Sequence, residues 1–289
     1  MTAKGQGMDV RIAPRWKAAI GAMFALMLVV GGASAVEPPR RIVSFNLCAD
    51  QLLLALADPS QIAALSPYAT DASLSVTTEQ AAAFPKIDWN SESVVNLAPD
   101  LVLSGFTDRP TQAILAAAGL RVVQVALVRN IDEARAQVRE LGVLLGHPER
   151  GEALASKLKH AENDLAAVAL KPPRTAIVLQ REGYTEGTES LVAAMLAVAG
   201  LTPPPNARGG IGGFMDMETL LTAGPDVLVL QEPASGATDQ GALFLTHPAL
   251  RARYDETRRI HLPSRDTLCG GPALLEGLGV LKHELQKLR

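Results

Sequence analysis

Two stretches of the chain repeat one pattern. Residues 92–103 read ESVVNLAPDLVL, and residues 218–230 read ETLLTAGPDVLVL. In both copies a glutamate precedes a Pro-Asp pair by the same interval, from 92 to 100 and from 218 to 226. Each copy predicts a short helix, a proline that ends it, and then a buried strand. The chain is therefore expected to contain two similar halves.

Apolar runs and amphipathic runs alternate on both sides of these copies. The predicted strands are Arg41–Phe45, Asp100–Ser104, Arg121–Leu127, Thr175–Gln180 and Asp226–Leu230. The predicted helices are Asp50–Ala57, Thr111–Ala118, Glu189–Ala199 and Leu281–Leu288. Continuous apolar strands between helices are typical of parallel sheets that are covered on both faces. The fold class that follows is α/β, with two Rossmann-like lobes built on parallel central sheets.

Residues 131–169 differ from both halves, because they are rich in the good helix formers Ala, Leu, Glu, Lys and Arg. Pro148 suits the first turn of a helix that would run to Ala169, about 22 residues or roughly 33 Å. Lys171-Pro172-Pro173 would stop it. We expect one long α-helix to join the lobes, with a signal peptide at 1–35, an N-terminal lobe at 36–147, the connecting helix at 148–170 and a C-terminal lobe at 171–289.

The N-terminal segment predicts export. Basic residues at positions 4, 11, 15 and 17 precede an apolar run from Ala18 to Val30, and Ala33-Ser34-Ala35 has the form that signal peptidase accepts. A membrane anchor is the alternative, but about 13 apolar residues are too few to span roughly 30 Å of hydrocarbon. No cysteine directly follows the run, so we expect a soluble periplasmic protein that starts near Val36 and carries no lipid anchor.

Charge excludes two classes of partner. The formal charge is −3, and the predicted leader holds four basic residues and one acidic residue, so the remainder carries about −6. No run of five or more Lys or Arg is present. A moderately acidic chain has no electrostatic reason to bind nucleic acid or anionic lipid.

The order of these features resembles a known family. The opening RIVS at residues 41–44, the two Glu-to-Asp repeats and the helical connector are similar to those of periplasmic cobalamin and iron–siderophore binding proteins of ABC importers, the helical-backbone class III solute-binding family. The resemblance covers Arg40 to Leu288. It implies a monomeric binding protein that delivers a metal chelate to the inner-membrane ABC permease dimer, with Glu92 and Glu218 docking on the permease. Taken alone, both glutamates are also compatible with ordinary acids at helix starts.

Open α/β sheets bind ligands at the carboxyl ends of their strands. The loops at those ends contain aromatic residues, which suit stacking on a flat chelate, and arginines, which suit binding of an anionic chelate. Each of these residues is also compatible with ordinary packing or with a solvated surface position. The candidate ligand-binding residues are Asn46, Cys48, Trp89, Phe106, Arg109, Arg181, Tyr184, Arg265 and Cys269. The arginines favour a ferric siderophore, cobalamin is close behind, and heme is a third candidate through Tyr184 or a cysteine as axial ligand.

The two cysteines leave three alternatives. Exported proteins usually oxidise a cysteine pair, so a disulfide between Cys48 and Cys269 is one. Two free thiols that contact the ligand, or thiolates that bind its metal, are the others. A secreted thiol-dependent enzyme or redox protein that uses these cysteines is the alternative function.

Other chemistry has little support in the sequence. The histidines, at positions 147, 160, 247, 261 and 283, are poorly placed for a bare metal site, and no cofactor is expected. The glycine-rich segment Gly209–Gly213 follows prolines rather than a strand and lacks the lysine of a phosphate-binding loop, so we expect a mobile loop there. No common hydrolase or zinc-protease motif occurs, and no enzymatic activity is expected.

Overall fold

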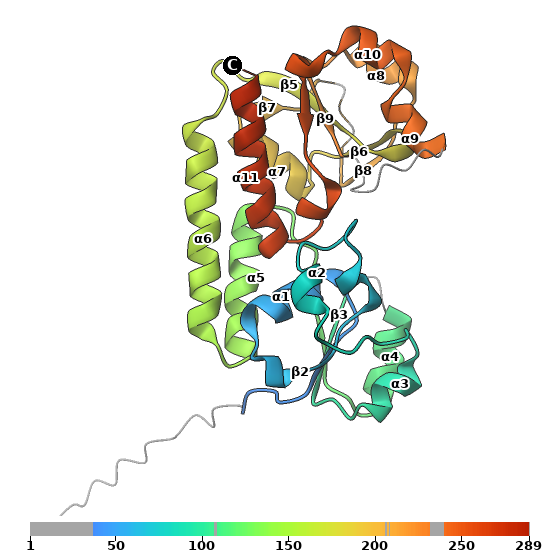
Figure 1. Ribbon diagram of the computed structural model, residues 1–289, viewed down its shortest axis with the longest axis vertical. Coiled ribbons are helices and arrows are strands. Elements are labelled where there is room, and N and C mark those ends of the chain that lie inside the picture. The colour runs from blue at the N-terminus through green and yellow to red at the C-terminus, as the bar shows by residue number, and fades with distance from the viewer. Residues whose placement is uncertain (1–36, 107–108, 206, 208, 232–239, 289) are drawn as a thin grey trace, which may run out of the picture. The chain divides into compact units, whose positions relative to one another are not determined.

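The first lobe is built on a parallel sheet. A computed structural model describes residues 37–106, 109–205, 207, 209–231 and 240–288. The sheet has the order β2-β1-β3-β4, and all neighbours in it are parallel. Its strands are β1 (Ile42–Ser44), β2 (Ile62–Ala64), β3 (Leu101–Ser104) and β4 (Val122–Gln124) (Figure 1). The predicted strands at 41–45, 100–104 and 121–127 are confirmed, whereas β2 was not predicted.

The second lobe repeats this topology. Its parallel sheet has the order β10-β9-β5-β7, so in both sheets the first strand lies between the second and the third, and the fourth lies at the far edge. Its strands are β5 (Arg174–Leu179), β7 (Leu201–Thr202), β9 (Val227–Leu230) and β10 (Arg259–His261). The predicted α/β class with two parallel-sheet lobes is confirmed.

An antiparallel ribbon is added to the second lobe. It pairs β6 (Tyr184–Glu186) with β8 (Gly212–Phe214). The prediction of a loop over Gly209–Gly213 was therefore wrong for Gly212 and Gly213. Gly212 has φ +142°, and a Cβ there would lie 2.5 Å from the carbonyl oxygen of Thr185. The glycines serve the close approach of two strands rather than mobility.

Helices cover both sheets. In the first lobe they are α1 (Leu47–Leu56), α2 (Thr78–Ala81), α3 (Ser91–Asn96) and α4 (Arg109–Ala117), with 3₁₀ turns η1 (Pro59–Gln61) and η2 (Pro67–Thr70). In the second they are α7 (Leu191–Val198), α8 (Met217–Ala223), α9 (Gln240–Leu245), α10 (Pro248–Arg253) and α11 (Pro272–Lys287), with η3 (Arg181–Gly183), η4 (Glu256–Arg258) and η5 (Ser264–Asp266).

The last helix is longer than the sequence predicted. The predicted Leu281–Leu288 is only the end of α11, which starts at Pro272. Glycines at 277 and 279 interrupt its apolar pattern, which hid the first half. A Cβ on Gly277 would lie 2.4 Å from the carbonyl oxygen of Asp266, so this glycine lets η5 pack against the helix.

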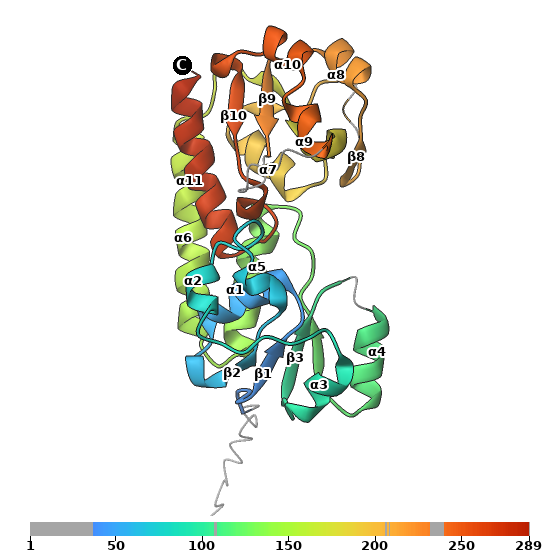
Figure 2. The same ribbon diagram turned by 45° about the vertical axis from the view of Figure 1, so that its right-hand side comes forward.

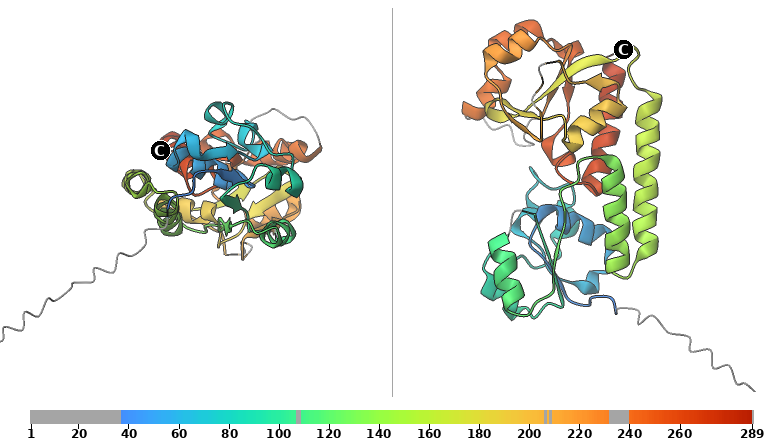
Figure 3. Two further views of the ribbon diagram at one scale, coloured as in Figure 1. Left: turned by 90° about the horizontal axis from the view of Figure 1, so that it is seen from below. Right: turned by 180° about the vertical axis from the view of Figure 1, so that it is seen from behind.

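Two helices, α5 (Ile131–Leu144) and α6 (Pro148–Ala167), connect the lobes. The long connecting helix predicted from Pro148 is present and ends two residues earlier than expected. Figures 1 and 3 show α6 running beside both lobes, with α5 packed on it at one end and α11 at the other. A Cβ on Gly151 would lie 2.7 Å from the carbonyl oxygen of Val138, so α5 and α6 meet with their backbones close together.

The two sheets share one hydrophobic core. A single cluster of buried side chains includes Ile42 and Leu101 of the first sheet and Val227 and Ile260 of the second. It continues without a break through α5, α6 and α11. Smaller clusters lie on the outer face of each sheet. Because the central cluster crosses from lobe to lobe, the lobes are not independent bodies.

One prediction concerns residues beyond this description. The predicted signal peptide, residues 1–35, lies outside the described residues. Within the described part of the chain, no helix has the length and apolar character needed to cross a membrane.

The glycine contact between α5 and α6 can be tested with alanine. Gly151→Ala places a methyl group against the backbone of α5, and we expect it to lower the unfolding free energy by about 1–3 kcal/mol. Gly279→Ala is the matched control, because a Cβ there meets nothing within 4 Å, and helix propensity predicts a gain of about 0.5–1 kcal/mol. Urea unfolding measures both. An unchanged or higher stability of Gly151→Ala would show that the helices are not in close contact.

Candidate functional site

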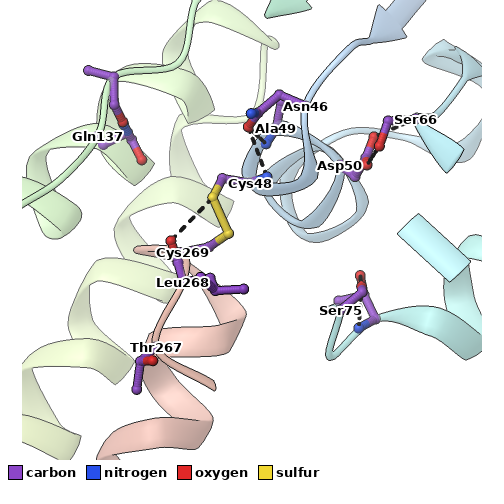
Figure 4. The surroundings of a disulfide bond; sticks show 12 residues. Asn46, Cys48, Ala49, Asp50, Ser66, Ser75, Gln137, Thr267, Leu268 and Cys269 are labelled. Carbon is purple, nitrogen blue, oxygen red and sulfur yellow. Dashed lines mark hydrogen bonds between the residues drawn. A yellow bond between two sulfur atoms is a disulfide. The ribbon is translucent and has the colours of Figure 1, made fainter. Parts of the chain in front are cut away.

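A disulfide joins the two lobes. Cys48 lies in the first turn of α1, and Cys269 lies just before α11, 221 residues later (Figure 4). The side-chain oxygen of Asn46 accepts hydrogen bonds from the backbone N–H groups of Cys48 and Ala49, which fixes this turn. Cys48 Sγ also lies 3.5 Å from the carbonyl oxygen of Leu268.

The disulfide decides between the three alternatives for the cysteines. Both sulfur atoms are used in the bond, so the free-thiol and metal-thiolate interpretations were wrong. A thiol-dependent enzyme is likewise not supported, because a nucleophile or metal ligand needs the thiolate. Cys48 and Cys269 instead form a covalent tie between the lobes.

A pocket lies beside this tie, between the lobes. We call it the junction pocket, and its volume is about 190 Å³. Leu127, Val128 and Arg129, from the segment that leads into α5, line one side of it. The second lobe provides the other side, with Gln180, Tyr184, Glu186, Glu189, Ser190, Leu191, Val192, Ile211, Thr267 and Leu268. Gln180 directly follows β5, so the pocket lies at the carboxyl ends of the second sheet.

The first lobe presents a group of aromatic rings, Phe45, Tyr68 and Trp89, which we call the aromatic shelf. The Trp89 ring centroid lies 5.0 Å from that of Tyr68 and 5.4 Å from that of Phe45. Phe45 is buried, but Trp89 is 41% and Tyr68 45% exposed. Trp89 has φ +65°, which is unfavourable for a bulky residue and is typically retained at functional sites. Sequence analysis found Trp89 but missed Tyr68.

The second lobe presents a further aromatic pair. The rings of Tyr184 and Phe214 meet edge to face, with centroids 5.5 Å apart. Burial raises the pKa of the Tyr184 hydroxyl, and the negative charge of Glu186 adds to this effect. Phe214 is 62% exposed and was missed, because β8 was not predicted. Phe106, which follows β3, is also exposed, as a residue available to a ligand must be.

The buried carboxyl of Asp50 fixes the turn that carries Tyr68 of the aromatic shelf. Asp50 of α1 accepts hydrogen bonds from the backbone N–H and the hydroxyl of Ser66, the residue before η2. Because η2 carries Tyr68, these bonds position the shelf. Burial raises the pKa of Asp50 to about 6, although hydrogen bonds from Ser44 and Ser66 and the charge of Lys86 act in the opposite direction.

The three candidate arginines lie on different elements. Arg109 begins α4, and its side chain is outside the described structure. Arg181 begins η3 and Arg265 lies in η5. Arg265 donates a hydrogen bond to the carbonyl oxygen of Ala72, 3.2 Å away, and its Nε lies 3.4 Å from Asp266. Arg265 therefore ties the second lobe to the first.

Glu92 and Glu218 occupy equivalent places. Each is exposed and lies in the first turn of its helix, α3 or α8, after a capping side chain, Asn90 or Asp216. In Figures 1 and 2 these two helices lie on the side of their lobes that faces away from α6. A carboxylate at a helix N-terminus is favoured by the helix dipole, so both groups remain available at the surface.

The aspartates of the two repeats have a structural role that sequence analysis missed. Asp100 accepts hydrogen bonds from the backbone N–H groups of Arg40 and Arg41, at the entry to β1. Asp226 accepts hydrogen bonds from the backbone N–H and the hydroxyl of Thr175 in β5, both at 2.8 Å. Each aspartate fixes the start of the strand beside its own, which explains why both copies place it directly before a strand.

The described residues contain no cluster of metal-binding side chains. Across the residues that the structure describes, no group of three or more His, Cys, Asp or Glu is arranged to hold a metal ion. His147 instead contacts Gln61 and Asp58 near the turn between α5 and α6.

Comparison with known proteins agrees with this architecture. Residues 42–263 match a family model described as periplasmic binding protein. No curated protein matches the sequence. The apo periplasmic heme-binding protein of Roseiflexus sp. RS-1 is similar in structure, with a TM-score of 0.70 and 23% identity over 86% of this chain and 99% of that one.

Two further solved structures are similar. The periplasmic vitamin B12-binding protein of Vibrio cholerae has a TM-score of 0.69 and 18% identity, over 86% of this chain and 97% of that one. A periplasmic heme-binding protein of Pseudomonas aeruginosa has a TM-score of 0.69 and 20% identity, over 84% and 91%. At these identities the likeness concerns the fold.

The buried Asp50 predicts a pH dependence of stability. Its pKa is about 6 in the folded protein against 3.8 for an ordinary aspartate, so between these values the folded state binds more protons than the unfolded state. The unfolding free energy that Asp50 contributes should therefore fall by about 2 kcal/mol as pH rises from 4 to 7. Asp50→Asn removes this slope. Urea unfolding of both proteins across this range measures the difference.

Asp58→Asn is the control for this measurement. A hydrogen bond from Arg150 lowers the pKa of Asp58, so its contribution has the opposite sign and is lost as pH falls. Equal pH slopes for the wild type and Asp50→Asn would contradict the role of Asp50.

Proposed function

Because the chain belongs to the periplasmic binding protein family, we propose that it captures a flat metal chelate between its lobes and delivers it to an ABC importer of the inner membrane. The observation that carries this proposal is the set of exposed rings in both lobes. The aromatic shelf lies in the first lobe and the Tyr184–Phe214 pair in the second. Exposed aromatic faces suit stacking on a planar macrocycle.

A tetrapyrrole, either heme or a corrinoid, fits these rings better than a ferric siderophore does. The siderophore assignment depended on three arginines that converge on an anionic chelate. Arg265 is engaged with Ala72 and Asp266, and the three arginines stand on different elements. Solved structures of similar fold include binding proteins for heme and for vitamin B12.

The candidate ligand contacts follow from this proposal. Trp89, Tyr184 and Phe106 would pack on the macrocycle, joined by Tyr68 and Phe214. Asn46 lies beside the disulfide, so it and the Cys48–Cys269 tie would form part of the cleft wall. Arg109, which begins α4, and Arg181, which begins η3, remain proposed contacts for an anionic or polar edge of the ligand.

Export and domain division complete the proposal. A signal peptide at 1–35 would place the protein in the periplasm, where the Cys48–Cys269 disulfide is stable. We propose the division into an N-terminal lobe at 36–147, a connecting helix at 148–170 and a C-terminal lobe at 171–289, and a monomer as the working form.

Docking is proposed to use Glu92 and Glu218. Each helix presents one exposed carboxylate on its own lobe, so one lobe would face each half of a permease dimer. Such charge pairs mainly set orientation and association rate. The shared core keeps the two carboxylates at a fixed separation.

Ligand binding is tested by titration of the exported, oxidised protein. Trp89 is the only tryptophan after the predicted leader, so its fluorescence reports directly on the cleft. We expect hemin or cyanocobalamin to quench it with one-to-one saturation, and ferric hydroxamate and ferric catecholate to bind more weakly. Tyr68→Ala should weaken binding about tenfold through the lost ring contact.

Val143→Ala is the control for the titration, because Val143 is 67% exposed on α5 and outside the cleft. It should leave affinity within about twofold. Saturation by none of the four compounds would overturn the proposed ligand class.

Docking is tested by reversing both charges. Glu92→Lys together with Glu218→Lys should abolish uptake of the labelled chelate by cells that carry the cognate importer, with ligand affinity in solution within about twofold of wild type. Glu140→Lys with Glu149→Lys makes the same change in net charge at exposed sites on α5 and α6 and should preserve uptake. Normal uptake by the first double variant, or a loss of its ligand affinity, would refute the docking role.

A further inference from the structure

A line of side-chain hydrogen bonds crosses the carboxyl ends of the second sheet. The Thr267 hydroxyl donates to the carbonyl oxygen of Ser264, and Gln231 Nε2 donates to Thr267 Oγ1 at 2.6 Å. Gln180 Nε2 donates to the side-chain oxygens of Gln231 and Glu186, both at 2.7 Å. Both amide hydrogens of Gln180 are therefore used, and the line ends on an acceptor, the carboxyl of Glu186.

A second donor reaches Glu186 from the start of α7. The Ser190 hydroxyl oxygen accepts a hydrogen bond from the backbone N–H of Ala193 and makes a side-chain hydrogen bond to Glu186. Because both neighbours donate, Glu186 is held as an acceptor. A carboxylate has about four lone-pair sites, so Glu186 can accept a further hydrogen bond in addition to those from Gln180 and Ser190.

Glu186 lines the junction pocket, where Leu127, Ile211 and Leu268 give the walls an apolar character. It also lines a small cavity of about 30 Å³ beside β5, which is too small for a ligand. The volume of the junction pocket, about 190 Å³, is below the roughly 300 Å³ at which ligand pockets begin. The junction pocket can therefore take only one edge of a macrocycle, and the rest of the ligand would lie outside it.

The charged groups around Glu186 do not neutralise it. Arg129 lies 3.8 Å from Glu189, and both side chains are more than half exposed, so water screens them. Tyr184, on the same strand, is the other titratable group that lines the pocket. Burial raises the pKa of Glu186, and the hydrogen bonds from Ser190 and Gln180 limit this effect.

We propose that Glu186 is a specificity-determining residue of the cleft, which accepts a hydrogen bond from an N–H group on the edge of the ligand and disfavours a carboxylate edge. This inference rests on the proposed function. An ionised carboxylate gains a charge-assisted hydrogen bond from a primary amide. Against a ligand carboxylate it meets like charge in a partly desolvated pocket, which is unfavourable. The pocket therefore selects a macrocycle whose rim carries amides over one whose rim carries acids.

Two tetrapyrrole probes distinguish an amide edge from an acidic edge. Cyanocobalamin carries amides on its rim, and hemin carries two propionates. Wild-type protein at pH 7.5 should bind cyanocobalamin more tightly. Glu186→Gln keeps the shape of the side chain and an acceptor for Gln180, so the fold is retained. It should weaken cyanocobalamin binding about tenfold and leave hemin binding unchanged or tighter. Glu149→Gln, an exposed carboxyl on α6 that does not line the junction pocket, should change either affinity by less than about twofold.

The pH profile provides a second measurement. Burial raises the pKa of Glu186, and its protonation removes the repulsion of hemin, so hemin affinity should rise more steeply with falling pH in the wild type than in Glu186→Gln. Equal effects of the two substitutions, or a wild-type preference for hemin, overturn this inference and leave the proposed function standing. Failure of the wild type to bind either probe contradicts the proposed tetrapyrrole ligand itself.

Discussion

The continuity of the hydrophobic core between the two sheets is the constraint on which the cleft depends. Side chains from both sheets belong to one buried cluster, which passes through α5, α6 and α11. Separation of the lobes would expose part of that cluster to water, which is unfavourable in proportion to the apolar area. The Cys48–Cys269 disulfide and the Arg265–Ala72 hydrogen bond add two further ties at the cleft. The two lobes that carry the proposed ligand-contacting rings are therefore held together before a ligand arrives.

Preorganisation of this kind has a consequence for binding. A cleft that does not need to close loses less conformational freedom when it captures a ligand. Hydrogen bonds also fix single side chains before a ligand binds. Asp50 holds the turn that carries Tyr68, and Gln180 and Ser190 hold Glu186 as an acceptor. The cleft thus combines rigid aromatic surfaces with a small number of fixed polar groups.

The fold could be predicted in large part from the sequence, because buried parallel strands are continuous apolar runs. The strands β3, β5 and β9 and the long helix α6 were found this way. Strands β2 and β7, which are three and two residues long, were missed. The β6–β8 ribbon was missed because its glycines permit a close approach that is visible only in three dimensions.

The site was less predictable. Trp89 and Tyr184 were found as rare rings at predicted loop positions, but their partners Tyr68 and Phe214 come from segments that only tertiary structure brings together. The pairing of the cysteines depends on how two lobes meet across 221 residues of sequence. The junction pocket, which Glu186 lines, is likewise formed by segments of both lobes that only the folded chain brings together.

The distance between the two lobes tests the shared-core constraint most directly. Spin labels attached at residues 92 and 218 by chemistry that spares the disulfide would report this distance by pulsed electron resonance. The shared core predicts one narrow distance distribution, which moves by less than about 2 Å when cyanocobalamin or hemin is added. A second population, or a larger shift on binding, would show that the lobes move as separate bodies and would contradict it.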